Sequence, residues 1–194
     1  MMPTLFDGDF ILVNKYAYGL RVPVTNAKVI PVGQPARGDV VVFRYPGMGP
    51  NDPTKGSDYI KRVIGLPGDE VTYRGRTLYV NGMQVATLPD GSYSGTTRSK
   101  DYVNYTRVTE KLPELDHEIL LGPPPGFAGG PEGSWRVSEG HFLVMGDNRS
   151  NSLDGRVWGL VPEANLVGKA FVIWMNWDFK DGGVDFGRLG TVIE

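Results

Sequence analysis

The sequence predicts a mostly β protein with few, short helices. Segments of strand length, rich in β-branched and aromatic residues, recur along the 194 residues, and each is bounded by Gly, Pro, Asn or Asp. No stretch keeps a helical apolar period beyond about two turns. Asn81 and Gly82 stand between two such segments, and both residue types accept the positive φ that a two-residue hairpin turn needs. Together these observations favour sheets joined by tight turns.

Seven segments carry the strand pattern. They are residues 9–15, 39–45, 58–65, 70–73, 77–80, 141–145 and 169–176. From residue 89 to 137 the composition changes to Gly, Ser, Thr, Pro and scattered charge. A structureless loop of that length is uncommon in a compact domain, so strands such as 102–108 are expected to organise it. We therefore expect a core made of residues 1–72 and 138–194, with a smaller, loop-rich β lobe, residues 73–137, inserted into it.

Composition and charge exclude several classes of protein. Lys and Arg total 20 against 22 Asp and Glu, which gives a net charge of −2 and no reason to expect nucleic acid as a partner. The absence of cysteine removes disulfides, thiolate metal sites and a cysteine nucleophile together. Apolar runs such as residues 39–43 and 171–175 are far shorter than the ~18 to 20 residues of a membrane helix. Nothing in this sequence is expected to span a bilayer.

The histidines limit the catalytic chemistry. Only His117 and His141 exist, and each is expected to be a surface residue or a core residue with its hydrogen bonds satisfied. A Ser-His-Asp triad therefore has few ways to be built, and no paired His or His-Glu spacing indicates a metal. We expect neither a metal nor a cofactor. If the protein is a hydrolase, a carboxylate or a lysine is the better candidate for the base.

Lys61 stands in an unusual place for a lysine. In the strand 58–65, alternation puts Lys61 on the face of Tyr59 and Val63, so apolar neighbours would surround its amine. Burial disfavours the ammonium form and can turn a lysine into a neutral base near neutral pH, at a cost of roughly 4 to 5 kcal/mol. The alternative is a strand-edge lysine whose amine reaches water. The residues alone leave both open and favour the second.

Four segments resemble bacterial type I signal peptidases in order and approximate spacing. Residues 1–5, Met-Met-Pro-Thr-Leu, followed by Gly8 and Asp9, look like the stretch after that family's nucleophilic serine. Residues 37–43, Arg-Gly-Asp-Val-Val-Val-Phe, are similar to its second conserved box. Residues 59–69, which begin Tyr-Ile-Lys-Arg-Val, resemble the box that holds the general-base lysine, and residues 146–159, which begin Gly-Asp-Asn-Arg-Ser, resemble the last box. The lysine box and the Gly-Asp-Asn-Arg box are highly specific together.

The resemblance implies a signal-peptidase-like β-barrel or sheet core and a role for six polar residues. Lys61 would be the base and Ser152 the hydroxyl that orients its amine. The residues that would support these two as ion pairs are Arg62, Asp147, Asp154 and Arg156. Ser152 has an alternative, because a serine in an Asn-Ser-Leu-Asp turn often caps its own backbone. The ion pairs could likewise orient a loop without touching substrate.

The resemblance also implies a peptide groove. Its expected lining residues are Met1, Leu5, Ile11, Tyr59 and Ile60. Alternation makes the side chains of Tyr59 and Ile60 face oppositely, so one of them would contribute only backbone. An extended substrate is expected to pair with the strand edge near residues 58–60, so that the backbone supplies affinity and the pockets supply specificity.

The function implied is that of a serine endopeptidase with a Ser-Lys dyad, which removes signal peptides from secreted preproteins after Ala-x-Ala sites. The nucleophilic serine would stand immediately before Met1, so the chain as given is expected to be inactive. The expected location is the bacterial inner membrane, with this domain on the periplasmic face and its N-terminal anchor upstream. Signal peptides and the membrane surface are the expected partners, and the chain is expected to be a monomer.

Two alternatives remain open at this point. A self-cleaving repressor-type Ser-Lys protease would share the dyad, but neither a DNA-binding segment nor a cleavage loop is visible in the sequence. A non-catalytic β-rich module could instead bind peptides or a membrane surface through its aromatic residues. Those residues are Trp158, Trp174, Trp177 and Phe179. Trp177 and Phe179 are also the residues we expect to contact a bilayer in the peptidase.

Overall fold

The computed structural model describes residues 1–194 except 22–27, 31, 94–101, 103, 124–129 and 178–181. Sixteen strands dominate it, and the helices are one turn of α-helix, α1 (Gly155–Trp158), and two short 3₁₀ helices, η2 (Glu163–Asn165) and η3 (Phe186–Arg188). The prediction of a mostly β fold with few, short helices is confirmed. In the described part of the chain, no helix has the length and apolar character needed to cross a membrane.

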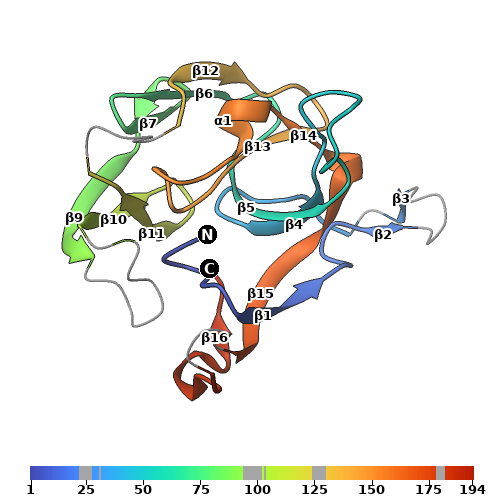
Figure 1. Cartoon of the computed structure of the whole chain (residues 1–194). Helices are drawn as coiled ribbons and strands as arrows, with labels where there is room; N and C mark the ends of the chain where they lie inside the picture. Colours follow the sequence, from blue (N-terminus) through green and yellow to red (C-terminus); the bar gives the residue numbers. More distant parts are fainter. Residues whose placement is uncertain (22–27, 31, 94–101, 103, 124–129, 178–181) are drawn as a thin grey trace.

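The largest sheet has seven antiparallel strands. Its order is β1 (Asp9–Asn14), β15 (Leu166–Asn176), β4 (Val40–Arg44), β5 (Asp58–Gly65), β13 (His141–Met145) and β14 (Val161–Pro162), and β16 (Thr191–Val192) also pairs with β15. In the described residues the order begins at β1 and ends at β14, so the core is an open sheet. A small ribbon, β2 (Leu20–Arg21) and β3 (Lys28–Ile30), lies beyond its β1 end (Figure 1).

Two further sheets come from the middle of the sequence and lie to one side of the large sheet (Figure 1). The first has the order β12 (Gly133–Arg136), β6 (Glu70–Arg74), β7 (Thr77–Val80) and β8 (Met83–Gln84); the second has the order β11 (Asp116–Leu121), β10 (Tyr105–Lys111) and β9 (Ala86–Tyr93). Asn81 and Gly82 join β7 to β8 with φ of 52° and 78°. The predicted hairpin is confirmed, and positive φ at both positions is the reason for these residue types.

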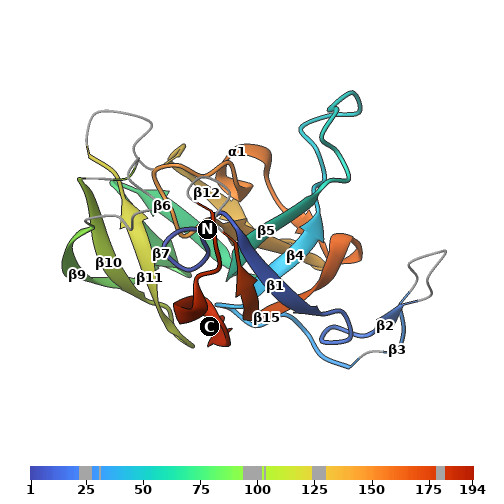
Figure 2. The same ribbon diagram turned by 60° about the horizontal axis from the view of Figure 1, so that its bottom comes forward.

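Three buried clusters hold the sheets together. The first joins β5 and β13 of the large sheet to β6 and β7, through residues such as Ile64, Leu143, Val71 and Leu78. The second fills the space around Phe43, and the third lies under β4, β15 and the two ends of the chain. The N and C marks lie close together in Figure 1 and apart in Figure 2, and the link between the two ends is Arg62 of β5, which donates to Thr4 Oγ1 and to the Glu194 carbonyl. Residues that are far apart in sequence are thus brought beneath β5.

Gly65, the last residue of β5, marks the tightest contact between the large sheet and its neighbour. A Cβ atom there would lie 2.8 Å from Val137 Cγ2, 2.9 Å from Val71 Cγ2 and 3.1 Å from Leu143 Cβ. These neighbours are buried and β-branched or strand-bound, so they have little room to move away. The absence of a side chain at residue 65 lets the two layers approach.

We predict that Gly65→Ala lowers the free energy of unfolding by about 1 to 3 kcal/mol, because overpacking forces the surrounding strands apart. The matched control is Gly49→Ala, since nothing lies within 4 Å of a Cβ atom there; its effect should stay within about 1 kcal/mol. Urea unfolding of both variants is the measurement. Equal stability of the two would show that the layers are not packed as closely as described.

Candidate active site

Lys61 lies at the point on β5 where one side of the strand has no neighbouring strand. β4 pairs with β5 from Asp58 to Arg62, whereas β13 pairs with β5 only from Arg62 onward and leaves it after Met145. The edge of residues 58–61 that faces away from β4 therefore has no strand partner among the described residues. An open edge presents unpaired backbone donors and acceptors to any extended chain beside it. Lys61 is the last residue of this edge.

The amine of Lys61 lies in a poorly solvated place. Burial lowers the pKa of the Lys61 ammonium below its ordinary value of 10.5. The nearby Asp154 and Asp147 carboxylates oppose this shift, and the Arg156 charge adds to it. Because burial outweighs the two carboxylates, the neutral amine is populated at a lower pH than in an exposed lysine. This is the property that a lysine base requires.

Ser152 and Lys61 meet at Gly146. A Cβ atom on Gly146 would lie 2.1 Å from Ser152 Oγ and 3.7 Å from Lys61 Cδ, so only glycine lets both side chains approach this point. Ser152 Oγ is buried and has no hydrogen-bond partner of normal geometry among the described residues, although it lies close enough to Asp154 to stabilise that carboxylate. The alternative in which Ser152 caps its own backbone is therefore not what the structure shows.

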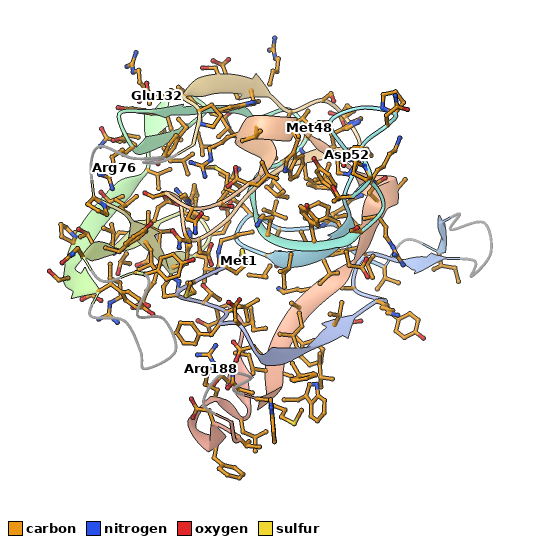
Figure 3. The ribbon with its side chains drawn as sticks, viewed as in Figure 1. Met1, Met48, Asp52, Arg76, Glu132 and Arg188 are labelled. Carbon is orange, nitrogen blue, oxygen red and sulfur yellow. The ribbon has the colours of Figure 1, made fainter. Side chains whose placement is uncertain are left out.

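The N-terminal nitrogen of Met1 lies within electrostatic range of the same lysine. Burial lowers the pKa of the Met1 amine below its ordinary value of 8.0, and the Lys61 charge lowers it further. Figure 3 places Met1 in the middle of the molecule, between β11 and the strands of the large sheet. Any residue bonded to this nitrogen in a longer chain would start in the same buried region as Lys61.

Arg62 and Asp147 form a buried ion pair beneath this point. Nε and Nη2 of Arg62 donate to the two carboxylate oxygens of Asp147, each at 2.9 Å, and both side chains are 1% exposed. Thr4 Oγ1 also donates to Asp147. Burial alone would raise the pKa of Asp147, but the Arg62 charge and hydrogen bonds, helped by His117 and Thr4, lower it to about 2. The carboxylate is therefore ionised at every physiological pH.

Asp154 and Arg156 hold the other end of the same loop. The Asp154 side chain caps α1 by accepting from Arg156 N, and it accepts from the Gly146 backbone N–H at 2.9 Å. Nε and Nη2 of Arg156 donate to it at 2.9 and 2.8 Å. Burial would raise the pKa of Asp154, but these hydrogen bonds and the Arg156 charge lower it. The loop from residue 146 to 154 is thus fixed at both ends.

Four of the five expected groove residues belong to one apolar cluster. Met1, Ile11 and Ile60 pack, partly buried, against a buried group that includes Leu5. The side chain of Tyr59 lies elsewhere: its ring stacks on Tyr45 with centroids 4.5 Å apart, within the second cluster. Of the adjacent pair, Ile60 faces the groove cluster and Tyr59 faces the opposite side, as strand alternation requires.

The structure adds residues that the sequence did not single out. Thr4 joins the Arg62–Asp147 pair, and Gly146 creates the space in which Ser152 and Lys61 meet. Both stand inside segments that carried the family resemblance, which was the available signal. His117 was expected to be a surface residue or a satisfied core residue, and this was wrong. It is buried, and neither ring nitrogen has a hydrogen-bond partner among the described residues.

His117 lies between two buried carboxylates. Its Nε2 is 3.5 Å from Glu110 Oε2 and 3.9 Å from Asp147 Oδ1. Burial lowers the pKa of His117 from its ordinary 6.5 to about 4; the charges of Arg62 and Arg149 act in the same direction, and those of Asp147 and Glu110 oppose it. The imidazole is therefore neutral at physiological pH. In the described part of the chain, no three His, Cys, Asp or Glu side chains are placed to hold a metal ion.

Comparison with known proteins places the chain among peptidases. The sequence profile of the family "Signal peptidase, peptidase S26" matches residues 1–177. Signal peptidase I of Pseudomonas aeruginosa is 46% identical to this chain, and the alignment covers 99% of this chain and 68% of the relative. Signal peptidase I of Pseudomonas fluorescens is 47% identical, and the alignment covers 91% of this chain and 62% of the relative. The crystal structure of a signal peptidase I from Enterococcus faecalis aligns with 71% of this chain and 97% of its own, with a TM-score of 0.42 and 31% identity.

The chain belongs to the signal peptidase family, peptidase S26. Its extent is narrower than that of its relatives, because it spans 62 to 68% of the length of the two Pseudomonas proteins. The resemblance found in four sequence segments is confirmed at the level of the family. Family membership does not by itself assign a role to Lys61 or Ser152.

We predict a pH dependence of stability that depends on His117. Because the pKa of His117 is lower in the folded state than in the unfolded chain, folding releases its proton at intermediate pH, and stability falls as pH drops from 6.5 through about 4. At about 1.4 kcal/mol per pKa unit, the full effect is roughly 3 kcal/mol. Urea unfolding at several pH values measures it.

His117→Gln should remove this part of the pH dependence. His141→Gln is the matched control, since His141 stands at the start of β13 with its Nδ1 near Ser138 and the Glu139 carbonyl, and it should keep the dependence. A His117→Gln variant that loses stability with falling pH as steeply as the unmodified protein would show that His117 is already protonated, or solvated, in the folded state.

Proposed function

We propose that this chain is the catalytic domain of a serine endopeptidase that removes signal peptides from secreted preproteins with a Ser-Lys dyad. The observation that supports this most directly is that three groups lie in one buried region: the desolvated amine of Lys61, the hydroxyl of Ser152, which approaches Gly146 together with Lys61 Cδ, and the N-terminal nitrogen of Met1, whose charge interacts with that of Lys61. In this proposal the nucleophilic serine is the residue bonded to the Met1 nitrogen in the complete protein.

The reaction then follows from the state of Lys61. Its neutral amine takes the proton of the serine hydroxyl as the oxygen attacks the carbonyl carbon at the cleavage site. The resulting ammonium gives that proton to the leaving amine, and an acyl-enzyme remains. Lys61, neutral again, takes a proton from water as it attacks the ester, and returns it to the serine oxygen. Ser152 accepts or donates a hydrogen bond to the amine and orients it throughout.

The open edge of β5 is the proposed place for the substrate. An extended peptide would pair with the backbone of residues 58–60 and so be held without regard to its side chains. The apolar cluster of Met1, Leu5, Ile11 and Ile60 lies under that edge and would take small apolar side chains, as Ala-x-Ala sites offer. The ion pairs of Arg62 with Asp147 and of Asp154 with Arg156 would position the loop opposite the peptide.

The surroundings we propose are those of a secretion enzyme. The complete protein would act as a monomer at the bacterial inner membrane, with this domain on the periplasmic side, and without a cofactor. Residues 73–137 would form a lobe inserted into a core made of residues 1–72 and 138–194. The family membership supports the first proposal, and the three-stranded sheet of β9, β10 and β11, which is built only from residues of that lobe, supports the second.

The dyad is tested by cleavage of a peptide that spans an Ala-x-Ala site. We predict turnover by residues 1–194 extended upstream by a short segment that ends in serine. Three other proteins should be slower by at least about a thousandfold: the unextended chain, the extended chain with alanine for that serine, and the extended chain with Lys61→Arg, because guanidinium stays protonated. Activity of the first protein should rise with pH as Lys61 loses its proton.

Lys55→Arg in the extended chain is the control, because Lys55 is an exposed lysine on the loop before β5 and should leave the rate unchanged. Substantial specific turnover by the unextended chain would mean that another nucleophile exists. Retained turnover by the Lys61→Arg variant would remove Lys61 from the mechanism.

An exposed apolar face supports contact with a membrane surface. It is formed by side chains of β1, β15, η3 and β16 that are at least 38% exposed: Phe10, Leu12, Phe171, Trp174, Phe186, Leu189 and Val192, with Trp177 just after β15. The rings of Phe10 and Trp174 contact each other, with centroids 5.9 Å apart. Trp158, which the binding-module hypothesis counted among the surface aromatics, instead packs against Phe43 and Tyr45. Phe179 lies outside the described residues.

We predict that the double variant Trp174→Ser and Trp177→Ser reduces co-sedimentation with vesicles of phosphatidylethanolamine and phosphatidylglycerol by several fold, because aromatic side chains favour the bilayer interface. The control is Met83→Ser with Leu88→Ser, which removes two exposed apolar side chains from β8 and β9. Sedimentation that is unchanged in the tryptophan variant would remove this face from any membrane contact.

A further inference from the structure

Residues 146–152, the first part of the loop between β13 and α1, are paired with β11 of the three-stranded sheet. Leu120 N donates to the Asp147 carbonyl at 2.9 Å, and Arg149 N donates to the Leu120 carbonyl at 3.0 Å. One residue further, Gly122 N donates to Ser150 Oγ at 2.8 Å. Figure 1 shows this loop running from β13 toward β11. The loop is therefore an additional strand-like partner on the edge of a sheet that belongs to residues 73–137.

A buried ion pair reinforces this contact. The guanidinium of Arg149 donates through Nη1 to Glu110 Oε1 at 2.6 Å and through Nη2 to Glu110 Oε2. Both side chains are at most 2% exposed. Two buried charges are tolerated only together, because removal of one leaves the other desolvated and unpaired. Glu110, on the middle strand β10, thus specifies where Arg149 must lie.

Arg149 connects this sheet to the far end of the loop. Its carbonyl accepts from Arg156 Nη2 at 2.9 Å, and Arg156 in turn holds Asp154. A second tether comes from Arg76, which follows β6 on the same side of the molecule (Figure 3) and donates to the Gly122 carbonyl at 2.7 Å. The loop residues between Asp147 and Asp154 are therefore held from the side opposite β5.

The same contacts reach the Arg62–Asp147 pair. His117 of β11 stands between Glu110 and Asp147, within 3.9 Å of both carboxylates. A continuous buried set of polar side chains thus runs from β10 and β11 to β5, where Arg62 is the neighbour of Lys61. Residues 146–152 are one glycine and six polar residues, so no apolar side chain anchors them, and fixing each residue costs about 1 to 2 kcal/mol of backbone entropy. The contacts with β10 and β11 offset that cost.

We propose that residues 73–137 serve as the scaffold of the active-site loop, and that Glu110 is a positioning residue that places Ser152 and Asp147 against Lys61 through Arg149. Glu110 does not contact substrate. It acts because a site must be held within about 0.5 Å of its working geometry, and this loop is held by the inserted lobe. The claim that the order of this loop affects the reaction rate rests on the proposed role of Lys61. The claim that Glu110 keeps the loop ordered does not rest on it.

The test compares Glu110→Gln with Glu118→Gln. Both change the same side chain on the same sheet, but Glu118 is 44% exposed and lies 3.7 Å from the exposed Arg107, where an ion pair contributes about 0 to 1 kcal/mol. In the complete protein, Glu110→Gln should lower kcat by about 10- to 100-fold with KM changed less than about threefold. Amide hydrogen exchange of residues 147–152 should become at least tenfold faster. Glu118→Gln should change neither quantity.

Ser150→Ala provides the same test if Glu110→Gln fails to fold. It removes only the acceptor of the Gly122 N–H, and it should speed exchange in the loop and lower kcat in the same direction by a smaller factor. Glu110→Asp, which keeps the carboxylate, should recover part of the rate lost in Glu110→Gln. A merely structural role of Glu110 would change the unfolding midpoint while leaving kcat and loop exchange in the folded protein unchanged, and this result would overturn the proposal.

The two proposals fail in different ways. If Lys61→Met retains turnover, the dyad is wrong, while faster loop exchange in Glu110→Gln would still support the scaffold. If Lys61 proves essential but Glu110→Gln, folded and stable at the assay temperature, keeps the rate and the loop exchange of the unmodified protein, the scaffold is wrong and the dyad stands. The lysine variant and the glutamate variant are therefore measured side by side.

Discussion

The buried pair of Arg62 and Asp147 is the constraint on which the rest of the site depends. Two charges that are 1% exposed have lost their water, and only a complete set of partners makes this tolerable. Besides both oxygens of Asp147, Arg62 donates to the carbonyls of Gly38 and Glu194 at 2.7 and 2.6 Å and to Thr4 Oγ1 at 3.3 Å. One guanidinium thus links β5 to four other parts of the chain.

This pair also determines the direction of the lysine next to it. Successive side chains of a strand point to opposite faces of the sheet. Because Arg62 points to the face where Asp147 lies, Lys61 points to the other face, toward Ser152 and Gly146. The same pair anchors the start of the loop that carries Ser152. The free-energy cost of desolvating the Lys61 amine is thereby offset by the stability of the surrounding ion pairs, and not by contacts to the amine itself. The proposed base is thus oriented by a neighbour whose own partners are Asp147 and two backbone carbonyls.

The sequence predicted what local patterns and short motifs can encode. The strand of Lys61, the Asn81–Gly82 turn and the approach of Lys61 to Ser152 followed from alternation, turn chemistry and the family boxes. The position of His117 did not, because its surroundings come from β5, β10 and the loop after β13, and no sequence spacing records such a meeting. The packing of Trp158, which is partly buried, was missed for the same reason: its ring contacts Phe43 and Tyr45, which lie far from it in sequence.

The partner of Arg149 was equally hidden. Glu110 stands in a strand of mostly polar residues, and the sequence alone does not say that this carboxylate is buried while the next residue, Lys111, and the carboxylate of Asp116 on β11 are exposed. A motif locates residues that act together within one segment. It cannot locate the side chain from another sheet that closes a charge pair, since that depends on how the sheets pack.

The open edge of β5 has a consequence for the behaviour of the protein in concentrated solution. Unpaired strand edges are the usual starting points for association between copies of a β protein, yet this one is short, covering residues 58–61, and carries Asp58 and Lys61 at its ends. A second β5 laid antiparallel would have to desolvate the exposed carboxylate of Asp58 while gaining hydrogen bonds over only four residues. A single flexible peptide can follow the twist of the edge and leave again. The open edge of β5 can thus pair with an extended peptide, while pairing between two copies of the protein at this edge is disfavoured.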